Sequence, residues 1–535
     1  MNGKLFLAVA AAACLLMGCL VCSEGRLSAA EWPEWRGPQR NGLAAESSPL
    51  LDAFPEGGPK KLWESEELYD RNNNPGHGSV VVASGRAYAF INLGFKVPTD
   101  ERVLTMGNLN GHGYAPDTPA DLLKAVEEAR VSDARKNLKT GKEIDPWVNE
   151  WLKANIKPEQ KKFTGIAQAR LRAGPAALPL DLLAKLATIA DKVFPTPEAF
   201  DQWFKDNGVD DAAKKEATKW VAKTKPACRD LVCCLDAETG KTVWKVDVQA
   251  RKEQEYGSSS TPAVAGGRLY IVTSAAVLTC LDAQTGKEIW KKQPFEKPPG
   301  NPCSSVVVVD GVVIASGDET VGLTAETGEV LWKAKGLAAA NPSPVVWKTP
   351  DKTCVIVNSK KLTCLETKTG KELWTAPGGG FSTPAVSGDF LAFILANKLV
   401  ALKLAPDKAE KLWEVPFADE YASPLVYKDY VYAVGAAPRD GKQGRAVCVE
   451  LKTGKVLWDG VVAGGAQFSS PVLADGKLLA FAGPSLCIIK ASPEQYVPLA
   501  SGKVNADGWT SLALADGKVF FRSASRVVCY SLAKQ

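Results

Sequence analysis

The sequence predicts an all-β fold: an eight-bladed β-propeller closed by an N-terminal strand, with an α-helical insertion in blade one. The first observation is a Ser or Thr that opens an apolar run eight times, at Ser79, Thr261, Ser305, Ser343, Thr383, Ser423, Ser470 and Ser511. The second is a Trp near the end of most repeats, at Trp244, Trp290, Trp332, Trp374, Trp413 and Trp458, with Trp63 ahead of them. The third is a Thr-Gly pair four residues before five of these Trp residues.

Each repeat reads as four strands. The opener begins the first strand, and a Thr-Gly turn joins the third strand to the Trp-bearing fourth, as in TGKTVW at 239–244. Glycine provides the positive φ that such a hairpin needs. In blade seven, which has no Trp, we expect the outer strand at Tyr496–Leu499.

Closure of the ring depends on the N-terminus. The last repeat, 508–535, has three strands and no Trp strand, whereas 60–66 offers a spare strand containing Trp63. Placing Trp63 in the last blade removes an open sheet edge, which would otherwise invite aggregation.

Blade one is interrupted. Its strands are expected near 79–92 and 231–246, with a helical region, 94–229, between them. Helical apolar spacing predicts helices at 121–138, 145–156, 180–193, 197–208 and 210–223. The predicted domains are a signal peptide at 1–30, an N-terminal segment with the start of blade one at 31–93, the insertion at 94–229, and the remaining propeller at 230–535.

The first thirty residues are typical of an export signal. Lys4 precedes an apolar stretch, and Ser28-Ala29-Ala30 offers a cleavage site. A second interpretation uses Leu16-Met17-Gly18-Cys19, which resembles a lipobox and would leave Cys19 lipidated. We therefore expect a protein of the periplasm or cell envelope, with or without a lipid anchor. No later apolar run has the length of a membrane helix, about 20 residues.

The composition excludes several function classes. The 65 basic and 60 acidic residues form no basic stripe, so a nucleic-acid partner is not expected. The only two histidines, His77 and His112, exclude His-rich metal sites, and no metal site is predicted. No Cys-x-x-Cys-His sequence is present for covalent haem attachment. No catalytic residue can be singled out.

Most cysteines fall at one repeat position, in the strand that leads into the Thr-Gly turn. These are Cys234, Cys280, Cys364, Cys448, Cys487 and Cys529. One small, weakly polar residue per blade is typical of a packing filler between sheets. Equivalent positions in neighbouring blades lie too far apart for disulfides, which need Cα atoms about 6 Å apart.

The repeats DAETGKTVW (236–244) and DAQTGKEIW (282–290) resemble the pyrroloquinoline-quinone-like (PQQ-like) propeller repeat. WPEWRGPQRNG at 32–42 resembles the start of many secreted bacterial proteins of this kind. The family includes quinoprotein alcohol dehydrogenases and the outer-membrane assembly-factor lipoprotein. The resemblance implies a structural role between blades for Trp63, Trp244, Trp290, Trp332, Trp374, Trp413 and Trp458. It also implies PQQ with calcium as a possible cofactor, although the family's floor Trp, Asp base and calcium ligands match no residues here one by one.

One position should line the mouth of the central funnel, because strand starts share one face of a propeller. This rim, two residues before each opener, comprises His77, Ser259, Cys303, Asn341, Phe381, Tyr421, Phe468 and Trp509. Its aromatic members can stack a planar ligand, grip a peptide, or simply plug the channel. Arg251, Arg439, Arg445 and Arg522 fall in links on the same face and can neutralise an acidic ligand.

Three functions follow from these features. The first is an exported, non-catalytic binding or scaffold protein that uses the funnel and the helical insertion to bind a partner or ligand. The second is a PQQ-dependent dehydrogenase, and the third is a glycan binder, which depends on the aromatic rim alone.

Overall fold

The computed structural model describes residues 31–44, 47–70, 74–250, 259–296, 303–339, 341–436, 443–464, 469–506 and 509–534. The described chain forms two compact units. One unit comprises Lys96–Pro226, and the other comprises the described residues up to Phe95 and from Ala227 onward. The second of these units is built of antiparallel sheets, most of them four-stranded, as expected for a β-propeller.

We number the sheets of this unit 1 to 8 in chain order. Sheet 1 has β2 (Asn74–Pro75), β3 (Val81–Ala83), β4 (Arg86–Pro98), β7 (Thr224–Asp236) and β8 (Thr242–Val248). Sheet 2 has β9 (Ala263–Ala265), β10 (Arg268–Val272), β11 (Leu278–Asp282) and β12 (Glu288–Lys292). Sheet 3 has β13 (Val307–Val309), β14 (Val312–Ser316), β15 (Thr320–Thr324) and β16 (Val330–Ala334). Sheet 4 has β17 (Val345–Lys348), β18 (Thr353–Asn358), β19 (Lys361–Glu366) and β20 (Glu372–Pro377).

The remaining sheets repeat this order. Sheet 5 has β21 (Ala385–Ser387), β22 (Phe390–Leu395), β23 (Lys398–Ala405) and β24 (Lys408–Pro416). Sheet 6 has β25 (Leu425–Tyr427), β26 (Tyr430–Ala436), β27 (Gln443–Glu450) and β28 (Val456–Ala463). Sheet 7 has β29 (Val472–Ala474), β30 (Lys477–Ala482), β31 (Ser485–Lys490) and β32 (Pro498–Lys503). Sheet 8 has β33 (Ala513–Ala515), β34 (Lys518–Ser523) and β35 (Arg526–Ser531), and β1 (Lys60–Glu64) is its fourth strand.

The eight openers form a closed cycle of hydrogen bonds, which we call the hydroxyl ring. Each opener's backbone N–H donates to the hydroxyl oxygen of the opener of the next sheet, over 2.9–3.2 Å. The cycle closes where the N–H of Ser511 donates to Oγ of Ser79 at 3.0 Å. A hydroxyl suits this position because it can accept from one neighbour while leaving its own proton available.

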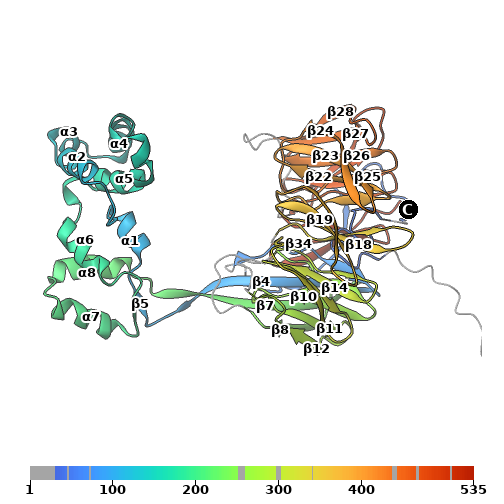
Figure 1. Ribbon diagram of the computed structural model, residues 1–535, viewed down its shortest axis with the longest axis horizontal. Coiled ribbons are helices and arrows are strands. Elements are labelled where there is room, and N and C mark those ends of the chain that lie inside the picture. The colour runs from blue at the N-terminus through green and yellow to red at the C-terminus, as the bar shows by residue number, and fades with distance from the viewer. Residues whose placement is uncertain are drawn as a thin grey trace, which may run out of the picture. The chain divides into compact units, whose positions relative to one another are not determined.

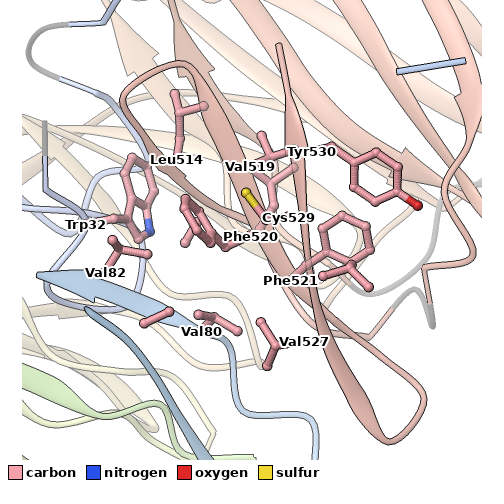
Figure 2. Packing of buried hydrophobic residues seen from close by; sticks show 14 of the residues in the cluster. Trp32, Val80, Val82, Leu514, Val519, Phe520, Phe521, Val527, Cys529 and Tyr530 are labelled. Carbon is pink, nitrogen blue, oxygen red and sulfur yellow. The ribbon is translucent and has the colours of Figure 1, made fainter. Parts of the chain in front are cut away.

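The N-terminal strand pairs with the end of the chain, as the sequence predicts. β1 is antiparallel to β35, with Trp63 opposite Cys529 and Glu64 opposite Val528. The core beside it joins sheets 7, 8 and 1, and Figure 2 shows Phe520, Phe521 and Val527 packed near Val80 and Val82. Trp32 covers this core and is hydrogen-bonded to Val82 through both backbone groups at 2.8 Å. Residues from both ends of the chain therefore share one apolar cluster.

Six of the seven Trp residues predicted to lie between blades donate Nε1–H to a carbonyl of the following sheet. The bonds are Trp63–Ala237, Trp244–Ala283, Trp290–Ala325, Trp332–Thr367, Trp413–Leu451 and Trp458–Ser492, at 2.7–3.2 Å. Trp374 is buried too, but its Nε1 has no hydrogen-bond partner in the described structure.

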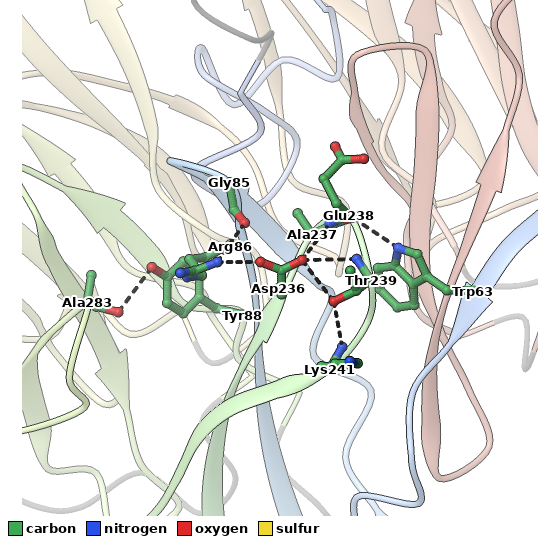
Figure 3. A network of polar contacts seen from close by, with 10 residues as sticks. All are labelled: Trp63, Gly85, Arg86, Tyr88, Asp236, Ala237, Glu238, Thr239, Lys241 and Ala283. Carbon is green, nitrogen blue, oxygen red and sulfur yellow. Dashed lines mark hydrogen bonds and ion pairs between the residues drawn. The ribbon is translucent and has the colours of Figure 1, made fainter.

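The Thr-Gly turn of sheet 1 shows how the motif works (Figure 3). Oδ1 of Asp236 accepts from the N–H and the hydroxyl of Thr239 at 3.0 and 2.9 Å. Gly240 follows with a φ of +72°, and a Cβ there would collide with the ring of Trp63. Glycine is thus required both by the turn and by the Trp of the preceding sheet.

The unit Lys96–Pro226 is largely helical and lies between β4 and β7 in chain order (Figure 1). Its helices are α1 (Met106–Gly111), α2 (Ala120–Arg130), α3 (Asp133–Lys136), α4 (Gly141–Asn155), α5 (Thr164–Ala173), α6 (Leu180–Ala187), α7 (Pro197–Asp206) and α8 (Asp211–Trp220). Short 3₁₀ helices, η1 (Pro158–Phe163) and η2 (Gly174–Ala176), and a β5 (Arg102–Val103) and β6 (Val193–Phe194) pair complete it. No helix in the described ranges is long and apolar enough to cross a membrane.

Several details differ from the sequence prediction. The single helix predicted at 121–138 is two helices, α2 and α3, and the helix predicted at 180–193 ends at Ala187. The sequence did not predict α5. The helix predicted at 145–156 starts four residues earlier than expected: α4 begins at Gly141, because the Glu143 carboxylate accepts from the N–H of Thr140 at 2.9 Å in a capping box. The outer strand of sheet 7 is β32 (Pro498–Lys503), later than predicted. Tyr496 instead packs against Trp458, with ring centroids 5.5 Å apart.

The six repeat cysteines are buried in the sheets as free thiols. In five sheets the cysteine lies directly opposite the Trp of the fourth strand: Cys234–Trp244, Cys280–Trp290, Cys364–Trp374, Cys448–Trp458 and Cys529–Trp63. In sheet 3 Gly322 occupies this place opposite Trp332, and in sheet 5 Ala401 lies opposite Trp413. Small size is the property that these residues share, since the indole lies over them.

The contact of Trp63 with sheet 1 can be tested by mutation. Trp63→Ala removes the bond to Ala237 and leaves a cavity, so we expect the free energy of unfolding to fall by about 3–5 kcal/mol. Its neighbour Leu62, 40% exposed, is the matched control, and Leu62→Ala should change stability by about 0.5 kcal/mol or less. Urea unfolding of both variants measures the difference, and equal losses would contradict the docking role.

Candidate functional site

A cavity of about 630 Å³ opens on the face where the sheets begin. Seven of the eight predicted rim residues line it: His77, Ser259, Cys303, Asn341, Phe381, Tyr421 and Trp509. The eighth, Phe468, lies outside the described residues. Seven members of the hydroxyl ring also line this cavity, which we call the funnel cavity; Ser423 is the exception. Its volume is within the range of about 300–1,000 Å³ that small-molecule sites occupy.

The exposed aromatic residues of the rim form stacked pairs. Phe381 lies parallel to Tyr421, with centroids 5.0 Å apart and an interplanar angle of 14°. His77 stacks on Trp509 at 4.9 Å and 23°. Phe381, Tyr421 and Trp509 are 41%, 46% and 47% exposed, so large flat surfaces stay in contact with solvent. Exposed apolar patches of this kind can mark sites of interaction with a ligand or a partner.

Hydrogen bonds made by polar side chains hold these pairs in place. Oδ1 of Asp419 accepts from the N–H groups of Tyr421 and Ala422 at 2.6 and 2.8 Å. Oγ of Ser259 accepts from the N–H of His77 at 3.0 Å. Nη1 of Arg522 donates to the carbonyls of Gly76 and Gly78, at 2.6 and 3.3 Å, on either side of His77. The aromatic groups therefore sit on loops whose backbones are fixed.

The proposed ligand-neutralising role of Arg522 is therefore wrong. The side chain is fully buried and is used on backbone carbonyls and on Oη of Tyr69. Arg445 forms an exposed ion pair with Asp459. Arg251 and Arg439 lie outside the described residues.

Trp35 also lines the funnel cavity, and the sequence analysis did not single it out. It belongs to the segment 32–44, which crosses the centre of the sheet unit. Its backbone bonds to Val82, Val264 and Leu473, in sheets 1, 2 and 7. The only sequence signal for Trp35 was its place in the segment 32–42, which resembles the start of related proteins. That resemblance does not say which side chains of the segment face a cavity.

Two buried arginines anchor this segment. Arg40 donates to the carbonyls of Val306 and Pro344 at 2.8 and 3.1 Å, and its Nη1 is 2.9 Å from Oε2 of Glu34. Arg36 donates to the carbonyl of Pro424. Because Ser305, Ser343 and Ser423 lie directly beside these acceptors, the arginines lie next to the hydroxyl ring.

Burial shifts the pKa values of these groups. Desolvation raises the pKa of Glu34, although Arg40 opposes the shift. Desolvation, and then the charge of Arg40, lower the pKa of Arg36 to about 9, so Arg36 stays protonated at neutral pH. Burial also raises the pKa of the Cys303 thiol, which therefore remains protonated and is a poor nucleophile.

A second polar cluster joins sheets 1 and 2. The buried carboxylate of Asp230 accepts from the N–H of Ser274 at 2.6 Å and from Nδ2 of Asn92. Nδ2 of Asn92 also lies 2.9 Å from Sγ of Cys228. Desolvation outweighs these hydrogen bonds and raises the pKa of Asp230 to about 6.

The described lining does not fit PQQ with calcium. PQQ is a flat quinone with three carboxylates, which proteins bind with arginine and lysine, and calcium needs several oxygen ligands, usually carboxylates. The described residues of the funnel cavity instead provide hydroxyl, amide, thiol, imidazole and aromatic groups. Within the described ranges, no three His, Cys, Asp or Glu side chains cluster as metal ligands.

A family model described as outer membrane protein assembly factor BamB matches residues 229–346 and 317–535, more than half of the chain. The chain belongs to this family. The PQQ-like resemblance of its repeats is thereby confirmed. No curated protein matches the sequence.

Several solved structures are similar to this chain. BamB from Moraxella catarrhalis is 16% identical, with a TM-score of 0.45, and the match covers 57% of this chain and 89% of that one. Quinohemoprotein alcohol dehydrogenase ADHIIG from Pseudomonas putida HK5 is 12% identical, with a TM-score of 0.44 and coverages of 58% and 73%. Quinohemoprotein alcohol dehydrogenase from Comamonas testosteroni is 14% identical, with a TM-score of 0.42 and the same coverages.

The hydroxyl ring offers a pair of adjacent serines for a matched test. Ser305→Ala removes the acceptor of the buried Thr261 N–H, so we expect the free energy of unfolding to fall by about 1–3 kcal/mol. The neighbouring Ser304 is also buried, but its Oγ has no hydrogen-bond partner among the residues that the structure describes. Ser304→Ala should therefore be neutral or slightly stabilising in denaturant unfolding. Equal effects of the two substitutions would contradict the role of the ring.

Asp230 should make stability depend on pH. Its pKa rises from 3.8 to about 6 on folding, so the unfolded chain loses this proton first as the pH increases. Its contribution to the free energy of unfolding should fall by about 3 kcal/mol between pH 4 and pH 6 and stay low above that range. Asp230→Asn should remove this slope, whereas Asp133→Asn, at a side chain 94% exposed, should retain it. Thermal or urea unfolding across this pH range measures both; an unchanged slope in Asp230→Asn would contradict the assignment.

Proposed function

We propose that this protein is an exported, non-catalytic binding protein of the cell envelope, and that its funnel cavity receives the ligand or a part of the partner. The observation that carries this proposal is the pair of exposed aromatic stacks, Phe381–Tyr421 and His77–Trp509, over a floor of hydroxyl groups. Apolar flat surfaces with a few fixed polar groups are what small-molecule and peptide sites share.

We further propose that the eight sheets are the blades of one ring. The closed cycle of the hydroxyl ring supports this count, because each of the eight sheets provides one opener and each opener is bonded to the openers of the two neighbouring sheets. The pairing of β1 with β35 supports it as well, because it gives the last sheet its fourth strand. The proposed domains are the signal peptide (1–30), the N-terminal segment (31–93), the helical insertion in blade one (94–229) and the rest of the propeller (230–535).

Export is supported by the N-terminal sequence and by family membership. The leader, including the lipidation site considered at Cys19, lies outside the described residues. The matching family model is described as an outer-membrane assembly factor, which supports a location in the cell envelope. The same description makes a protein the main alternative to a small molecule as the occupant of the funnel cavity. In that case the helical unit would provide a second binding surface.

The dehydrogenase alternative requires PQQ. Trp35 and Trp509 provide the kind of flat surface on which a quinone can stack. The described lining offers it neither carboxylate partners nor calcium ligands, so we place this function second.

Crystals of the full chain soaked with a fragment library, and separately with PQQ and calcium, test the proposal. We expect fragments to collect between Phe381, Tyr421 and Trp509, with no retained quinone. Phe381→Ala with Tyr421→Ala should abolish this occupancy, whereas Leu412→Ala, at another exposed apolar residue, should not. An unoccupied funnel with fragments bound elsewhere would overturn the binding function, and bound quinone would favour the dehydrogenase.

A further inference from the structure

The hydroxyl ring has an unused hydrogen-bonding capacity. Each of its hydroxyl oxygens accepts one backbone N–H, but among the described residues none of the eight hydroxyls donates to a protein acceptor. The members are only 1–6% exposed, yet seven of them line the funnel cavity. A hydroxyl carries one donor and two acceptor sites, so each ring member keeps one O–H to offer.

These hydroxyl donors need hydrogen-bond acceptors at the floor of the cavity. A buried polar group without a partner costs about 1–3 kcal/mol, and water or a ligand must meet that cost. The donors follow one another around a closed circle, one for each sheet. A matching ligand therefore carries oxygen acceptors around its periphery rather than at one end.

A large part of the cavity lining beyond the hydroxyl ring is aromatic. Trp35 contributes an indole from below the rim, and the stacked pairs Phe381–Tyr421 and His77–Trp509 contribute the walls. The C–H faces of sugar rings pack on aromatic faces of this kind, while their hydroxyls point outward along the ring edge.

Several other side chains that line the cavity are polar and uncharged. Asn341, Ser259 and the Cys303 thiol, whose protonated form is favoured by burial, add amide, hydroxyl and thiol groups. Such groups pair with neutral hydroxyls and ether oxygens, whereas phosphate and carboxylate ligands are usually met by arginine or lysine.

We propose that the funnel cavity binds a neutral saccharide. In this proposal sugar oxygens accept hydrogen bonds from the hydroxyl ring, and sugar faces pack on Trp35 and on the stacked pairs Phe381–Tyr421 and His77–Trp509. This inference rests on the proposed binding function and names its ligand class. A peptide is the competing occupant. An extended peptide presents its carbonyls along a line and on alternate sides, so it matches a circle of donors less well than a polyol does.

Binding of neutral oligosaccharides to the full chain tests the inference. The probes are maltotriose, cellotriose and the trimer of N-acetylglucosamine, measured by titration calorimetry and on a glycan array. We expect at least one to bind. Ser305→Ala should weaken it about tenfold, which corresponds to about 1.4 kcal/mol for one lost hydrogen bond, and Ser304→Ala should leave the affinity unchanged. Phe381→Ala with Tyr421→Ala should abolish binding.

A crystal soak of the unmodified chain keeps the test independent of how the variants fold. Sugar oxygens within 3.5 Å of the ring hydroxyls, a distance about at the limit of a hydrogen bond, would support the inference. No saccharide binding by the unmodified chain, or equal weakening by Ser304→Ala and Ser305→Ala, would overturn it. Fragments or an aromatic peptide in the funnel without saccharide would overturn the ligand class alone, whereas an empty funnel in every soak would overturn the binding function as well.

Discussion

The hydroxyl ring is the constraint on which the rest of the sheet unit depends. In every sheet one strand begins two residues after a Ser or Thr whose hydroxyl accepts the N–H of the previous opener. These N–H groups come before the first strands and have no sheet partner, so without the hydroxyls they would be buried and unsatisfied. The bond from Ser511 to Ser79 joins the last sheet to the first, and each position therefore serves its own sheet and its neighbour.

In six of the eight sheets the outer strand makes a second link to the next sheet. A Trp of one sheet donates to a carbonyl of the next and covers the glycine of its Thr-Gly turn, as Trp63 does with Ala237 and Gly240. Small residues opposite the indole, such as Cys234 behind Trp244, make room for it. The hydroxyls connect all eight neighbouring sheets where the first strands begin, and the Trp bonds connect six of them at their fourth strands.

The candidate site is a consequence of this architecture. Because the strand starts meet around the axis, the residues just before them, including Phe381 and Tyr421, border a common cavity. The segment 32–44 then crosses beneath, anchored by Arg36 and Arg40 on carbonyls beside the hydroxyl ring. Arg36 and Arg40 donate hydrogen bonds to backbone carbonyls just before the first strands. These bonds fix the segment at the base of the cavity, and Trp35 therefore lines it.

The sequence by itself determined the repeat, the strand order and the closure by residues 60–66, because spacing of Ser, Thr-Gly and Trp is a local property that repetition makes visible. It also placed His77, Phe381, Tyr421 and Trp509 at one level, since equivalent positions of a repeat occupy equivalent places. Only the tertiary structure decided which of them stack, because stacking depends on loop geometry that differs between repeats. Only the structure revealed that Trp35 lines the cavity and that Arg522 is buried against backbone carbonyls. The residues that they contact lie far away in the sequence, and neither contact recurs from repeat to repeat, so no sequence pattern predicts it.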